Sequence, residues 1–268
     1  MKDFGDAQKL DWRPSDLLRM VAERYRLGLK TIDGAIEDQT EERFDKWDFS
    51  NRDDLQEFFN EVMDDEIVNS FDQKEDPLAY IIRHTQLLPR EFILIFNRAI
   101  RASKEEIGSW RRLTGNAVRY AVEQTETELA KHILLPYQTV YPKLLRACQA
   151  VMPELPPICE KRDLDKVGSR FKGRIEEDVF DVWNTLFEIG ILGYVENNPT
   201  PSFVDDDRYV YAFFKYNSSS PIAFRNECQY CVHPLFSRYW SLNRPAGSSL
   251  QFVYPANIEH FRARPKTR

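Results

Sequence analysis

A single proline, Pro89, separates two helical patterns of apolar residues in the first half of the chain. Proline is tolerated in the first turn of a helix and biases the preceding residue, here Leu88, away from helical geometry. The residues after Pro89 follow the i, i+3, i+4, i+7 spacing of a buried stripe: Phe92, Ile93, Phe96, Ala99 and Ile100. We therefore predict that one helix ends near His84 and a second begins at Pro89, where free N–H groups favour an anion.

The same reasoning predicts further helices before residue 152. Ser15 is predicted to cap a first helix that ends between Gly28 and Gly34. The apolar stripe of this helix is predicted to consist of Leu17, Leu18, Val21, Tyr25 and Leu29. A second helix is expected near 52–63. Thr114 is predicted to cap a helix that Pro136 ends, and another helix is predicted at about 138–151. Five aromatic residues within 35–76 are expected in the core: Trp47, Phe49, Phe58, Phe59 and Phe71.

The proline-rich run from Met152 to Pro157 cannot form an α-helix, and we place a domain boundary there. Beyond it the pattern predicts helices at 163–171 and 175–189, and strands near 190–195, 208–216 and 229–232. A polar tip at 197–201 separates the first two strands, and a closing helix is predicted at 233–240. A helix, a strand, a polar tip and a returning strand resemble a winged helix-turn-helix domain.

Charge is distributed unevenly over the 268 residues. The net charge is −6, yet residues 1–76 alone carry 22 acidic and 11 basic side chains, so the first quarter repels nucleic acid. No apolar run approaches the length of a membrane span, and the first residues show no apolar signal segment. Four cysteines without framework spacing indicate reduced thiols. We predict a cytoplasmic protein that does not bind membranes.

The stretch from His84 to Arg90 resembles the lid motif of a bacterial family of P-loop ATPases in the AAA+/STAND superclass. In that family a helix like Pro14–Val21 precedes the motif, and a winged helix closed by a segment like Cys231–Phe236 follows it. The resemblance implies a mostly α fold with a small β-wing. It also implies two domains: a helical lid-like domain at 1–152 with an acidic N-terminal quarter, and a winged-helix domain at 153–268 with a basic C-terminal tail.

The resemblance assigns nucleotide contacts to Pro89, Arg90 and His233. Where that family usually has the sequence Met-His-Asp, this chain has Val232-His233-Pro234. No G-x-x-x-x-G-K-[ST] phosphate loop occurs in the sequence, so ATP or ADP would be bound only beside a separate nucleotide-binding core. A simpler interpretation pairs Arg90 with an acidic neighbour such as Glu91 and gives His233 local hydrogen bonds.

Metal and enzyme chemistry find little support in the sequence. The spacing of Cys228, Cys231 and His233 is that of a metal half-site, but a strand would direct the two cysteines to opposite faces. No second pair with ligand spacing follows. No G-x-S-x-G, H-E-x-x-H or catalytic cysteine context is present. We predict no metal, no catalytic residues and no enzymatic activity by this chain alone.

DNA binding is the alternative class. Winged helices often read DNA through the helix before the wing, but residues 175–189 contain five carboxylates and no Lys or Arg. Basic stretches at 161–174 and 262–268 leave weak, non-specific nucleic-acid binding open. We therefore predict a regulatory and interaction module that binds a protein partner or a missing ATPase core. An adaptor that docks through its acidic first quarter, and a homo-oligomer, remain open.

Overall fold

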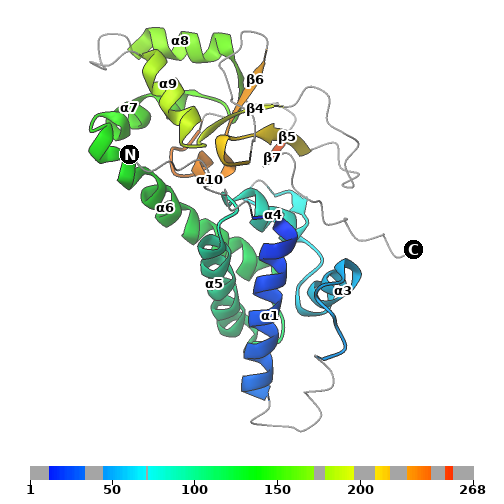
Figure 1. Ribbon diagram of the computed structural model, residues 1–268. Coiled ribbons are helices and arrows are strands. Elements are labelled where there is room, and N and C mark those ends of the chain that lie inside the picture. The colour runs from blue at the N-terminus through cyan, green and yellow to red at the C-terminus, as the bar shows by residue number, and fades with distance from the viewer. Residues whose placement is uncertain are drawn as a thin grey trace, which may run out of the picture.

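The chain is mostly α-helical with a small sheet, as predicted, in a computed structural model that describes residues 12–33, 45–70, 72–171, 179–195, 209–217, 228–242 and 251–255. The helices are α1 (Pro14–Asp33), α3 (Arg52–Val62), α4 (Pro77–Arg83), α5 (Pro89–Ile107), α6 (Gly115–Val140), α7 (Leu144–Val151), α8 (Lys161–Phe171), α9 (Val179–Glu188) and α10 (Pro234–Ser237). Short 3-10 turns lie at Met152–Glu154 and Lys215–Asn217. Figure 1 shows the long helices on one side of the molecule and the sheet on the other.

Local capping explains why the predicted break between α4 and α5 is confirmed. Asp76 caps α4 by accepting the N–H of Ala79, and α4 ends at His84. The chain then turns through Leu87, whose φ of 58° lies in the left-handed region, and Pro89 becomes the first residue of α5. Thr114 caps α6 as predicted, because its side chain accepts the N–H of Ala117.

Pro136 does not end α6, contrary to the prediction. The helix continues to Val140, because Pro136 lies on an exposed face where water reaches the carbonyl that loses its partner. Leu134, two residues before Pro136 and therefore on the other face, is buried and holds the helix in place. The helix predicted at 138–151 therefore begins only at Leu144, since Pro142 forces Tyr141 out of helical geometry.

The closing helix predicted at 233–240 is also shorter than expected. The α-helix α10 ends at Ser237, and turns follow it. Ser241 has a φ of 49°, and the N–H of Leu242 bonds to the carbonyl of Ser237 at 3.0 Å. This left-handed residue with a six-to-one hydrogen bond is the arrangement that commonly terminates helices.

Five strands form the sheet in the order β3 (Ile158–Glu160), β6 (Gln229–Val232), β4 (Leu192–Val195), β5 (Tyr209–Phe213) and β7 (Phe252–Pro255). The predicted pairing of the two strands around the polar tip is confirmed, since β4 and β5 are antiparallel partners. β7 joins β5 in parallel. The tip itself, at 197–201, lies outside the described residues. A separate short pair, β1 (Ile67–Val68) and β2 (Lys74–Glu75), precedes α4.

Two large hydrophobic cores fill the described part of the chain. The first unites α1, α3, α4, α5 and the start of α6 with the β5–β7 edge of the sheet, and it contains the predicted aromatics Trp47, Phe49, Phe58 and Phe59. Phe71 lies outside the described residues. The second core joins the end of α6 and α7 to α8, α9, β4 and β6. α6 therefore belongs to both cores, and the domain boundary at residue 152 stays a prediction.

Among the described helices, none combines the length and apolarity that crossing a lipid bilayer requires.

Candidate functional site

The stretch from His84 to Glu91 lies where the long helices meet the sheet layer. The side-chain amide of Gln86 donates toward the carbonyls of Ile189 at 3.5 Å and Gly190 at 3.3 Å, between α9 and β4. Gly190 has a φ of 74°, and a β-carbon there would stand 2.9 Å from the ring of Tyr216. The turn predicted to carry nucleotide contacts thus fixes one layer of the protein against the other.

Glu91 occupies the anion position at the start of α5. Its carboxylate accepts the backbone N–H of Gln86 at 2.6 Å and also bonds to the backbone of Leu88, the cap residue. This is the reciprocal bond of a capping box, made from the third helical position. Burial raises the pKa of Glu91 to about 7. The anion that this helix terminus favours is therefore supplied by the chain itself.

Pro89 and Arg90 point away from that buried turn. Pro89 is half-buried, whereas Arg90 is exposed, and its guanidinium lies 3.3 Å from Nδ1 of His132 on α6. The hydrogen-bond partner of Arg90 is thus a histidine of the neighbouring helix and not the carboxylate of Glu91.

His233 is fully buried at the start of α10. Its Nδ1 accepts the N–H of Leu235 at 3.2 Å, so its ring proton is on Nε2, 2.8 Å from the hydroxyl oxygen of Tyr216. Burial lowers the pKa of His233 to about 3, which keeps the ring neutral at pH 7. Local hydrogen bonding is what the simpler interpretation expects. His233 offers no exposed surface to a phosphate, and Arg90 turns instead toward α6.

The two cysteines of the suspected half-site lie on opposite faces of the sheet, as strand geometry predicts. Cys231 is buried in a small core with Phe214 and Val253, and Cys228 packs against the second large core on the other face. Burial raises the pKa of the Cys231 thiol well above its usual value. Within the described ranges, no group of three or more His, Cys, Asp or Glu side chains is arranged to hold a metal ion.

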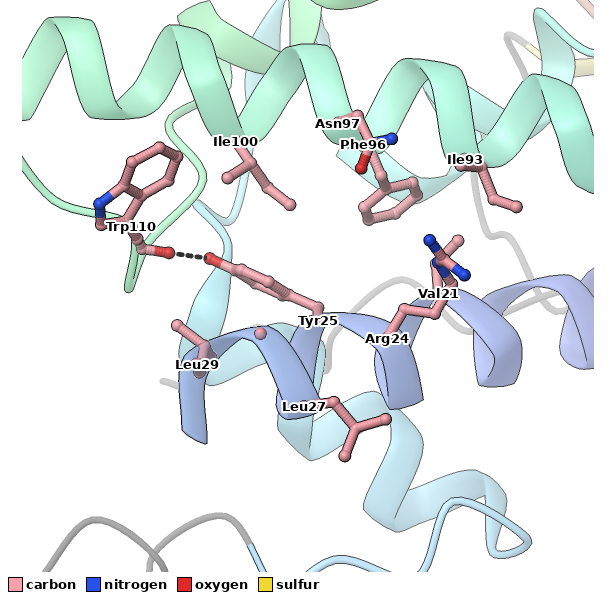
Figure 2. Close-up of a pocket in the computed structure, with 11 residues that line it drawn as sticks. Val21, Arg24, Tyr25, Leu27, Leu29, Ile93, Phe96, Asn97, Ile100 and Trp110 are labelled. Carbon is pink, nitrogen blue, oxygen red and sulfur yellow. Dashed lines mark hydrogen bonds between the residues drawn. The ribbon is translucent and has the colours of Figure 1, made fainter. Parts of the chain in front are cut away.

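A groove of about 400 Å³ runs between α1 and α5 (Figure 2). Its floor is apolar, formed by Val21 and Tyr25 of α1 together with Phe96 and Ile100 of α5. Trp110, from the loop after α5, closes one end. The hydroxyl of Tyr25 donates to the backbone carbonyl of Trp110 at 2.5 Å, which ties that loop to α1.

The rim of the groove is positively charged. Arg24 is the only charged residue among the described residues that line it. Arg24 and Asn97 are exposed, and neither makes a hydrogen bond or ion pair with the part of the chain that the structure describes. Lys104, farther along α5, places its amine 5.4 Å from the centre of the Trp110 ring. Leu27 is 60% exposed beside these groups.

Most residues of the groove floor were predicted as buried from the sequence, but the groove itself was not predicted. The stripes of α1 and α5 were predicted as buried, and Tyr25, Leu29, Phe96 and Ile100 belong to them. Leu27 and Trp110 lie off those stripes, and no pattern in the sequence marked them as part of a groove. Comparison of the chain with known protein families, curated proteins and solved structures finds no match.

Proposed function

We propose that this chain is a non-catalytic interaction module that binds an amphipathic helical segment of a protein partner in the groove between α1 and α5. The observation that carries the proposal is the open apolar groove with Arg24 unpaired at its rim. Its volume lies within the range of roughly 300–1,000 Å³ common for binding sites.

The length of the groove supports a helical occupant. Lining residues extend from Val21 to Leu29 on α1 and from Ile93 to Ile100 on α5. With a rise of about 1.5 Å per residue, these spans correspond to roughly 10–12 Å. A helix presents apolar side chains at positions i, i+3 or i+4, and i+7 over the same distance, which is how grooves between helices recognise their ligands.

The charge of the rim supports acidic residues in the occupant. Arg24 has no partner within the described ranges, and no carboxylate is among the described residues that line the groove. Exposed ion pairs add little affinity, typically about 0–1 kcal/mol, but they set the orientation and speed of association. Apolar burial therefore supplies the affinity in this proposal, and Arg24 selects an acidic helix.

The proposed role is compatible with the lid and winged-helix half of an ATPase, which stays a prediction. The order β3, α8, α9, β4, β5, β6 along the chain, with β6 between β3 and β4 in the sheet, supports a winged-helix arrangement. A separate nucleotide-binding core is one candidate for the protein that supplies the acidic helix. The contacts of Arg90 and His233 give no further support to nucleotide binding.

DNA binding gains no support from the basic stretch on α8. Three of its cations already pair with carboxylates of the same region: Lys161 with Asp165, Arg162 with Glu160, and Arg170 with Glu154. α9 carries Glu188 and no Lys or Arg in its described span. A phosphate backbone would have to displace these carboxylates, which reduces the gain from neutralising phosphates.

A display selection of helical peptides tests the proposal. Peptides are selected on the wild-type protein and counter-selected on Leu27→Glu, which places a carboxylate at the groove without touching the core. We expect enriched peptides with apolar residues at i, i+4 and i+7 and with Asp or Glu beside them. The matched control is Leu135→Glu on α6, because Leu135 is 61% exposed against 60% for Leu27.

Binding of the selected peptides should fall at least tenfold on Leu27→Glu and stay unchanged on Leu135→Glu. Arg24→Glu should weaken acidic peptides and favour basic ones. Peptides that bind wild type and Leu27→Glu equally, or a selection that yields basic helices, would overturn the proposal.

A further inference from the structure

A second cavity, of about 500 Å³, lies where α4, α6 and α10 meet. It shares no lining residue with the groove. Its walls carry ionisable side chains from three elements, including Arg83 and His84 at the end of α4, Glu123 and Glu126 on α6, and Arg238 after α10. Figure 1 shows α4 and α10 close to the middle of α6, between the long helices and the sheet.

One wall of the cavity is a rigid, buried ion pair. Arg83 donates two hydrogen bonds to the carboxylate of Glu75, both at 2.8 Å, and the Glu75 side chain is fully buried. The guanidinium lies 5.0 Å from the ring centres of both Tyr80 and Phe252. This bidentate pairing neutralises the charge of Arg83 inside the protein.

His84 and Glu126 face each other in the interior. Nδ1 of His84 lies 2.6 Å from the carbonyl of Tyr80 and therefore carries a proton that it donates to that oxygen. The ring is thereby oriented with Nε2 toward Glu126, 3.3 Å from a carboxyl oxygen. Both side chains are more than nine-tenths buried. At the mouth of the cavity, Arg238 is bound to Glu123 at 2.6 Å.

The charges around the cavity leave one carboxyl group without a permanent counter-charge. Arg83 is matched by Glu75 and Arg238 by Glu123, whereas the one ionisable side chain of the described residues that pairs with Glu126 is His84. Burial raises the pKa of Glu126 to about 8, although Arg83 and Arg238 act in the opposite direction. Glu126 is therefore mostly protonated at pH 7, and the cavity holds a polar, uncharged acid at its centre.

We propose that this cavity binds a small organic cation, a primary amine or a guanidine, whose charged nitrogen contacts the carboxylate of Glu126. The hydroxyls of Tyr80, Ser237 and Ser241 line the same space and accept the remaining N–H groups. The described lining residues offer an anion no arginine that is not already matched by a carboxylate, since Arg83 pairs with Glu75 and Arg238 with Glu123.

Binding of the cation releases a proton. The protonated Glu126 gives up its hydrogen to the solvent as the ammonium or guanidinium arrives, so the carboxylate and the ligand form an ion pair and the cavity stays neutral. The ionisation is inexpensive, because the pKa of Glu126 lies close to neutral pH. A neutral ligand of the same shape does not drive this step.

Isothermal titration calorimetry tests the proposal with named probes. Putrescine, agmatine and benzylamine are titrated into the full chain at pH 7 in buffers of different ionisation enthalpy, and succinate and phosphate serve as anionic probes. We expect saturable binding of at least one cation at one site, with a heat that changes with the buffer, as proton release requires. We expect no binding of the anions.

Glu126→Gln should weaken the binding of that cation at least tenfold and remove the dependence on buffer. The matched control is Glu128→Gln on the same helix, since Glu128 pairs with Arg98 and does not line the cavity. If Glu126→Gln does not fold, Ser237→Phe fills the cavity from α10 and should abolish binding. No saturable cation binding, equal binding by these variants, or binding of the anions instead would overturn the proposal.

Discussion

The groove and the cavity are hollows of similar size built in opposite ways. The groove between α1 and α5 is open and apolar, and Arg24, the one cation among its described lining residues, has no partner in the described part of the chain. The cavity between α4, α6 and α10 is walled by the buried Arg83–Glu75 ion pair and the buried contact between His84 and Glu126, which also hold the fold together. Substitutions around the cavity should therefore affect stability and binding together, whereas substitutions at the exposed rim of the groove should affect binding alone.

The largest expected effect comes from breaking the buried pair. Glu75→Ala leaves Arg83 buried without a counter-charge, and we expect a loss of about 3–5 kcal/mol in the free energy of unfolding. Chemical denaturation measures it. The control is Arg162→Ala, which removes a pair of the same length, 2.8 Å, from an exposed position and should stay close to wild type. Equal losses for both variants would contradict the contrast between buried and exposed pairs.

The next effect is a pH dependence that belongs to the cavity. The folded-state pKa of Glu126, about 8, lies above the ordinary glutamate pKa of 4.5, so the folded protein holds its proton more tightly. This contribution to stability is complete below about 4.5 and is lost as the pH rises toward 8. Wild type should therefore lose up to about 1.4 kcal/mol per pH unit relative to Glu126→Gln between these limits. Parallel stability curves for the two proteins would show that the carboxyl is not held in its acid form.

A smaller effect is expected at the closed end of the groove. Tyr25→Phe removes the hydrogen bond to the carbonyl of Trp110 and should cost about 0.5–1.5 kcal/mol. Thermal unfolding followed by circular dichroism measures the loss. Tyr120→Phe is the control, because Tyr120 is 54% exposed on α6 and should not change stability. A loss as large as that of Glu75→Ala would mean that the Trp110 loop supports the whole helical layer.

The smallest effect is expected at the rim. Arg24→Ala should change the free energy of unfolding by less than about 0.5 kcal/mol, because Arg24 has no partner in the described part of the chain. The same denaturation experiment measures it. A marked destabilisation would contradict the distinction between a groove rim that affects only binding and a cavity that also supports the fold.

The parts of the fold that follow from local chemistry were predictable from the sequence. Pro89 set the start of α5 and Thr114 the start of α6, since a proline or a cap acts within one turn of chain. The continuation of α6 through Pro136 was not predictable, because the buried contact of Leu134 that holds the helix depends on distant residues. The pairing of β4 with β5 was visible as two apolar strands, but the parallel addition of β7 required the folded arrangement.

The sites were less predictable than the elements. The stretch that contains His84 was singled out from the sequence. The partner of His84, Glu126, is one of 43 acidic residues, and no sequence pattern distinguishes it from the others. Burial distinguishes Glu126 from the others, and burial is a property of the packed chain. The roles of Arg90 and His233 were inferred from a resemblance, and the structure shows both in contacts with their own neighbours.

The placement of α6 in both large cores has a consequence for cooperativity. Its 26 residues form one continuous helix of about 39 Å, with Val122 in the first core, Leu129 in the second, and Glu126 between them at the cavity. Neither core can open without exposing part of the other, because they share a single backbone hydrogen-bond ladder. The chain should therefore melt as one unit, and a ligand held against Glu126 would stabilise both cores at once.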